Sequence, residues 1–198
     1  MYKIVTTPNQ VLGNIAKPAE KFDKKLKDIL LSMEETLRNT SDPIGVGLAA
    51  PQVGLSLRIF QLRPDEKSSV RNFINPEILS ISEEGNEYTS QSGKKKEAID
   101  LGKIPAPKGK RLLEGCLSIP NIWGYVQRRK EVTLSYQDEN GKKHEEVFTG
   151  FPAIIVQHEM DHLNGILFTN HVMTQNEKLF KSHKDKSGED VFEEIDLV

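Results

Sequence analysis

The chain has 198 residues, of which 36% are hydrophobic and 28% charged, enough to bury the core of one domain. A formal net charge of −2 gives no basic footprint for general nucleic-acid binding, and the sequence contains a single cysteine and therefore no intramolecular disulfide. No apolar run approaches the roughly 20 residues of a membrane span, and the first residues resemble no secretory signal. We therefore expect a cytoplasmic protein that does not enter membranes.

The first regular element that the sequence predicts is an amphipathic helix between Asp23 and Asn39. Large apolar residues recur there at helical spacing, which gathers them on one face. We expect this face to cover a β-sheet. Its residues are Phe22, Leu26, Ile29, Leu30, Met33 and Leu37.

A glycine-containing segment, 45–52, follows the helix. Its glycines allow close approach of the backbone to a partner, and the amide of Gln52 can donate hydrogen bonds. Strands are predicted next at 57–62 and 71–75.

Residues 82–111 interrupt this pattern. They contain glycines, prolines and the run Lys94–Lys96, but few large apolar residues, which indicates a surface insertion. We expect the lysines to be solvated, with contact to ribosomal RNA as the alternative.

The lone cysteine, Cys116, lies in the segment 114–118. A single thiol can be buried apolar filler, a reactive nucleophile or a metal ligand, and the residues around it leave these roles open. Strands predicted at 132–136 and 145–148 then flank Asn140-Gly141 as a β-hairpin. Mostly antiparallel sheet with few helices indicates an α+β fold.

A buried helix is expected after this hairpin. Thr149 or Gly150 can cap its start, residues 153–156 are all apolar, and Asn164-Gly165 can stop it in a left-handed conformation. The residues after about 181 alternate charged and apolar side chains, which predicts a loosely docked C-terminal helix or a polar tail.

The sequence His-Glu-x-x-His on the buried helix carries the strongest chemical signal. His158 and His162 are four residues apart, so both imidazoles lie on one helical face and can bind one metal ion. A zinc protease with a long helix would carry a third histidine where this chain has Phe168. The third ligand must come from elsewhere, unless the two histidines are ordinary core residues bonded to backbone.

Three segments together resemble the signature motifs of the peptide deformylase family: Gly-x-Gly-Leu-Ala-Ala-x-Gln at 45–52, Glu-Gly-Cys-Leu-Ser at 114–118 and Gln-His-Glu-x-x-His at 157–162. The resemblance extends over about residues 1–81 and 112–170. It implies one catalytic domain, 1–198, with mostly antiparallel sheets around a central metal-binding helix.

The resemblance implies removal of the formyl group from N-formylmethionyl peptides, with release of formate. Cys116, His158 and His162 would bind a divalent metal, with Fe²⁺ as the native ion and Zn²⁺, Ni²⁺ or Co²⁺ as alternatives. Glu159 would act as general acid and base. The oxyanion would be stabilised by the Gln52 amide and the backbone N–H of Leu117.

The resemblance also suggests a methionine pocket, although each aliphatic member could instead be ordinary core. The matching positions are Val46, Leu112, Phe151, Ile154 and Ile155. Gly47 and Gly115 would offer backbone hydrogen bonds to an extended peptide, and Arg128 and Asp161 would orient the site. An arginine often found after the cysteine motif has no match, and Trp123 lies in that region.

The partners implied are N-formylmethionyl peptides and the ribosome near its exit tunnel. Two rival functions remain open at this point. A metalloprotease could take Glu177 as its third ligand, and a non-catalytic binder of peptide ends could keep the metal as a structural staple.

Overall fold

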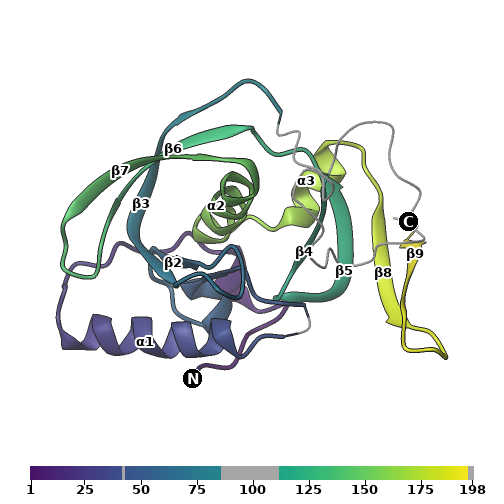
Figure 1. The fold of residues 1–198 in the computed structure, drawn as a ribbon, viewed down its shortest axis with the longest axis horizontal. Helices are drawn as coiled ribbons and strands as arrows, with labels where there is room; N and C mark the ends of the chain where they lie inside the picture. The colour runs from purple at the N-terminus through teal and green to yellow at the C-terminus, as the bar shows by residue number, and fades with distance from the viewer. Residues whose placement is uncertain (42, 86–111, 196–198) are drawn as a thin grey trace.

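The computed structural model describes residues 1–41, 43–85 and 112–195. Two antiparallel sheets, one of five strands and one of four, lie on either side of a central helix, α2 (Gly150–Leu163), as Figure 1 shows. The expected α+β fold with mostly antiparallel sheets around this helix is confirmed.

The five-stranded sheet has the order β1-β2-β3-β6-β7. The strand predicted at 71–75 is longer than expected and runs to Ile81. The predicted hairpin around Asn140-Gly141 is confirmed, and Gly141 has a φ of +80° in its turn. The strands are β1 (Gly47–Ala49), β2 (Ile59–Leu62), β3 (Arg71–Ile81), β6 (Glu131–Gln137) and β7 (Lys143–Thr149).

Helix α1 (Lys24–Arg38) confirms the first predicted helix. The Asp23 carboxylate caps it by accepting a hydrogen bond from the backbone N–H of Leu26. Met33 and Leu37 are fully buried against the strands, so the predicted apolar face does cover the sheet. Two short 3₁₀ helices precede and follow it along the chain, at Gln10–Gly13 and Ala50–Val53.

The four-stranded sheet has the order β4-β5-β8-β9 and corrects the prediction for the C-terminus. Residues 179–184 and 190–195 form strands, where a helix or a polar tail was expected. Phe180 on β8 is buried against Tyr125 on β5. This packing between distant segments stabilises the hairpin of β8 and β9 despite its many charged residues. The elements are β4 (Leu112–Cys116), β5 (Ile119–Val126), the short helix α3 (Phe168–Thr174), β8 (Leu179–Lys184) and β9 (Asp190–Ile195).

Helix α2 has the expected limits. Thr149 precedes its first residue, Asn164 ends it, and Gly165 follows at φ +71°. The helix is buried on most sides: Ala153 and Val156 are fully enclosed in a cluster with residues of the large sheet. The metal-binding sequence is therefore carried on a rigid, water-poor element.

The predicted insertion at 82–111 lies largely outside the described residues. Of it, only 82–85 is described, where the backbone N–H of Ser82 donates to the Glu131 carbonyl and Gly85 forms a bridge with Arg129. None of the helices in the described ranges is long and apolar enough to cross a membrane.

Candidate active site

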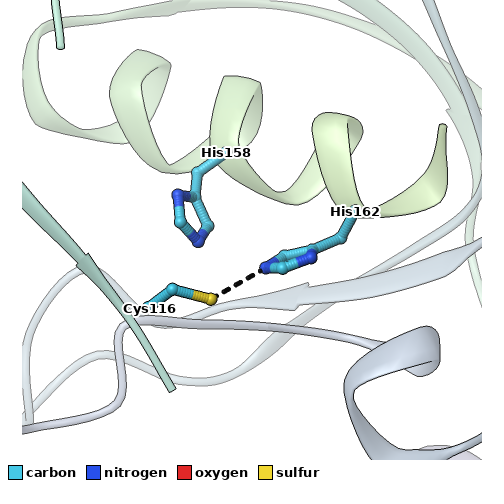
Figure 2. Close-up of side chains that lie close together, drawn as sticks. All are labelled: Cys116, His158 and His162. Atoms are coloured by element: carbon cyan, nitrogen blue, oxygen red, sulfur yellow. Dashed lines mark hydrogen bonds between the residues drawn. The ribbon is translucent and has the colours of Figure 1, made fainter. Parts of the chain in front are cut away.

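Three potential metal ligands meet between α2 and β4. Figure 2 shows His158 and His162 pointing from adjacent turns of α2 towards the thiol of Cys116, which comes from the end of β4. Their ligand atoms all lie within 4.8 Å of one another, and the Cys116 Sγ is 3.2 Å from the His162 Nε2. The structure thus brings Cys116 to the two histidines as the candidate third ligand.

The thiol is prepared for ligation by its neighbours. Burial raises the pKa of Cys116, but the adjacent imidazoles of His162 and His158 outweigh it and lower the pKa to about 5. A thiolate at neutral pH with two imidazoles is a donor set that suits a borderline divalent metal ion. These residues fit such an ion.

A buried charge network orients His158. The Glu114 Oε1 lies 2.7 Å from the His158 Nδ1, and both Glu114 oxygens accept hydrogen bonds from Arg128. Burial raises the pKa of Glu114, but Arg128 and His158 outweigh it and hold that pKa well below its usual range. Arg128 also donates to Asp161, 2.6 Å away, which His171 contacts in turn.

The role of Glu114 was not predicted from the sequence. The signal was present, because residues two apart on a strand share a face, and Glu114 stands two before Cys116. Arg128 and Asp161 are expected to orient the site: Arg128 contacts the Glu114 carboxylate beside His158, and Asp161 accepts a hydrogen bond from Arg128.

Glu159 is 2% exposed and borders the metal-binding group. Burial raises its pKa to about 7, and the nearby imidazoles of His158 and His162 oppose this rise. Its Oε2 has no hydrogen-bond partner within the described part of the chain. A buried, unpaired carboxyl oxygen with a pKa near neutrality is suited to take up and release a proton.

Gly47 gives Glu159 its space. A Cβ at this position would overlap the Glu159 Oε1 and would lie 2.7 Å from the Ile155 Cγ2. A larger residue at position 47 would therefore displace the Glu159 carboxyl group. Gly47, which was predicted to bind a peptide through its backbone, thus also provides the space that the Glu159 side chain occupies.

Gln52 is held in position at the end of the same segment. Its Oε1 accepts a 2.8 Å hydrogen bond from the backbone N–H of Ala49, which orients the Nε2 towards the Cys116 Sγ, 3.6 Å away. The side chain is 1% exposed. Leu117 follows Cys116 directly, in the turn between β4 and β5, and its half-buried side chain packs against the core cluster that α1 shares with the large sheet.

The positions predicted for a methionine pocket converge only partly. Ile154 and Ile155 are buried on α2, and Val46 and Phe151 pack at the margin of the same core cluster as Ile155. The backbone of Leu112 begins β4 opposite Val126, whereas its side chain lies outside the described part of the structure.

Two sheet edges flank the metal-binding group. Strand β1, with Gly47, is the first strand of the large sheet, and β4, with Gly115, is the first strand of the small one, within the described ranges. An edge strand presents free backbone donors and acceptors, so each can pair with an extended peptide.

Comparisons with known proteins agree with this arrangement. A sequence model of the polypeptide deformylase family matches residues 1–178. The peptide deformylase of Novosphingobium aromaticivorans is 36% identical over 192 residues, covering 86% of this chain and 88% of that protein. That of Borreliella burgdorferi is 35% identical over 187 residues, covering 94% of this chain and 97% of that protein.

Solved structures are similar in fold as well as in sequence. The crystal structure of peptide deformylase from Thermotoga maritima has a TM-score of 0.69 and 37% identity, covering 86% of this chain and 97% of that one. A peptide deformylase from Plasmodium falciparum gives a TM-score of 0.69 and 35% identity, with 85% of each chain covered. The chain belongs to the peptide deformylase family, the metal-dependent hydrolases that remove the N-terminal formyl group from newly made polypeptides.

Proposed function

We propose that the centre formed by Cys116, His158 and His162 carries out this deformylation with Glu159, Gln52 and Leu117 as its catalytic residues. The observation that carries the proposal is the convergence of the Cys116, His158 and His162 ligand atoms within 4.8 Å beside the buried carboxyl group of Glu159. Neither Glu159 nor Gln52 is needed merely to hold a metal.

The reaction adds water to the formyl carbon and breaks its bond to the methionine nitrogen, giving formate and a free amine. When bound, a divalent metal ion supplies Lewis acidity, which activates water near neutral pH and polarises a carbonyl group. Glu159 accepts the proton of the attacking water on a carboxyl oxygen. It then delivers this proton to the leaving nitrogen, so one residue serves as base and acid.

The tetrahedral oxyanion requires donors that already point to it. The Nε2 of Gln52 is a suitable donor because Ala49 fixes the opposite end of the amide and burial keeps water away. The backbone N–H of Leu117 is the second donor, one residue beyond the thiolate in sequence. Preorganised donors of this kind need no reorientation as charge develops.

The substrate is an extended peptide with N-formylmethionine at its start. Its backbone pairs with the edges that contain Gly47 and Gly115, as an added strand does. The unbranched methionine side chain occupies an apolar lining, a setting that suits a flexible thioether. That lining consists of Val46, Leu112, Phe151, Ile154 and Ile155.

Fe²⁺ is proposed as the native ion on family resemblance, whereas the donor set alone also suits Zn²⁺, Ni²⁺ or Co²⁺. We propose that the protein acts in the cytoplasm, on chains leaving the ribosome. Shortening the insertion 82–111 tests whether it contributes to that encounter. If ribosome binding falls while a small formyl-Met peptide is still cleaved, the insertion is a docking element; if both stay normal, the run Lys94–Lys96 is solvated surface.

The rival functions have less support. A metalloprotease with Glu177 as ligand would leave Cys116 without a role, and among the described residues the metal-binding group includes Cys116 and not Glu177. A binder without activity would not need a buried acid beside the metal ligands.

The test is metal analysis of protein purified without oxygen, together with a formate-release assay on a formyl-Met peptide. About one equivalent of metal and release of formate are expected, with loss of both after chelation. Cleavage of internal peptide bonds without formate release would support the protease instead. Binding of formyl peptides with no cleavage would support the binder.

A further inference from the structure

Trp123 on β5 lies on the face of the small sheet that is turned away from the metal ligands. On the neighbouring strand β4, Glu114 and Cys116 point to α2, where each contacts a histidine. Gly115, between them, faces the opposite side because successive residues of a strand alternate, and it is the partner of Trp123 in the pairing of β4 with β5. The metal ligands and the indole therefore occupy the two faces of one short stretch of β4.

The indole extends across the sheet from β8 to β4. Its Nε1 donates a 3.0 Å hydrogen bond to the Ser182 Oγ on β8. At its other end, a Cβ built on Gly115 would lie 2.7 Å from the ring atom Cε3 and 2.8 Å from Cζ3. The six-membered ring thus covers Gly115, whose lack of a side chain lets the ring reach towards the outer edge of β4.

The ring is held in this orientation from a second side. Phe192 on β9 meets it edge to face, with ring centroids 5.9 Å apart and an interplanar angle of 76°. Trp123 nevertheless stays partly exposed to solvent. An aromatic ring fixed in this way offers a contact surface that loses little conformational freedom when a ligand stacks on it.

A peptide paired with the edge of β4 brings its second residue to this face. Under the proposed function, the first side chain points to α2, beside Ile154 and Ile155, and the formyl group lies at the metal ligands. Side chains alternate along an extended peptide, so the residue after formyl-Met projects to the opposite face. That is the face on which Trp123 lies over Gly115.

We propose that Trp123 is a specificity-determining residue that selects the second residue of the substrate. Its six-membered ring stacks with an aromatic or large apolar side chain at that position, which a small or acidic side chain cannot match. The proposal rests on the proposed function and adds to it a preference beyond formyl-Met. One aromatic contact corresponds to a roughly 2- to 10-fold preference.

The test compares kcat/KM for formyl-Met-Phe-Ser and formyl-Met-Ala-Ser in the metal-loaded enzyme. The wild type is expected to prefer the phenylalanine peptide, and Trp123→Leu to reduce the ratio of the two values by about 2- to 10-fold. Trp123→Phe keeps an aromatic contact with Phe192 but shortens the ring, so an intermediate ratio is expected. Tyr125→Leu is the matched control, because this residue of the same strand and cluster pairs with Leu113, further from Cys116, and should leave the ratio unchanged.

An active wild type whose ratio is unchanged in both Trp123→Leu and Trp123→Phe overturns the specificity proposal alone. A ratio that falls equally in Tyr125→Leu also overturns it, because the effect would then belong to the packing of the sheet. Absence of formate release by the wild type from either peptide would instead overturn the proposed function, and the specificity proposal with it. Melting temperatures of the variants, measured alongside, identify any variant that does not fold.

Discussion

Glu114 and His158 form the contact that joins the metal ligands to the rest of the fold. The Glu114 Oε1 is 2.7 Å from the His158 Nδ1, so this nitrogen donates to the carboxylate and the Nε2 is left with its lone pair for a metal. Arg128 holds the carboxylate in turn, with its Nε 3.0 Å from the Glu114 Oε2. The direction of the imidazole is therefore fixed by the contacts of Glu114 and Arg128.

Replacing Glu114 with Gln should weaken metal binding by roughly 10- to 100-fold, the usual effect of losing a partner behind a ligating histidine. The affinity is measured by competition with a chromogenic chelator. Glu84→Gln is the control, since that carboxylate is exposed and pairs with Lys130 at the surface. Equal affinities in Glu114→Gln and wild type would show that His158 needs no such partner.

Replacing Glu159 with Gln should leave the metal bound and nearly abolish turnover. The acid is not among the proposed ligands, and loss of general acid and base catalysis reduces rates by roughly 10²–10⁴-fold. Metal content and formate release are measured on the same preparation. Formate release close to the wild-type rate would remove Glu159 from the mechanism.

Gln52→Leu should lower kcat by roughly 10²–10³-fold, as expected when one oxyanion donor is lost, with the metal retained. The amide donates to the Cys116 Sγ and accepts from the Ala49 N–H, so circular dichroism should accompany the kinetics. If kcat is unchanged in a folded Gln52→Leu variant, the oxyanion is stabilised by other groups.

Much of the site could be predicted from the sequence because its residues stand in short, local patterns. The spacing of His158 and His162 fixes their common face on a helix, and the caps of α2 define where that helix begins and ends. The glycine of the first motif is explained by the space that Glu159 needs beside Gly47.

The parts that could not be predicted depend on contacts between distant segments. The C-terminal strands are stabilised by the packing of Phe180 on Tyr125, which no local pattern reveals. In the same way, β3 extends to Ile81 because it pairs with β6 over that length. The hydrogen bond that Arg128 donates to Glu114 forms only when β4 and β5 pair, and this strand pairing was not predicted.

The ion pair of Arg71 and Glu146 should make stability depend on pH. Its hydrogen bonds with Arg71 lower the pKa of Glu146, so the unfolded chain binds the proton more readily than the folded one. The stabilisation is present above the ordinary carboxyl pKa of roughly 4.3, and it is lost as the pH falls through the lower pKa that Glu146 has in the folded protein. Both side chains are more than a third exposed, so its size should stay below about 1 kcal/mol.

The free energy of unfolding of wild type and Glu146→Gln, measured in urea from pH 7 to pH 3, checks this expectation. The variant should be less stable at pH 7, and the difference should shrink towards pH 3. A difference that stays constant over the range would mean that the carboxylate charge does not contribute.

Metal content of Cys116→Ser, measured beside Glu177→Ala, tests most directly that the thiolate and the two imidazoles form the catalytic metal centre. A neutral hydroxyl is a much poorer ligand than a thiolate for a borderline ion, so Cys116→Ser should lose metal and formate release together. Glu177→Ala should retain about one equivalent of metal and its activity. A full equivalent of metal in Cys116→Ser, with metal lost from Glu177→Ala, would contradict the centre described here.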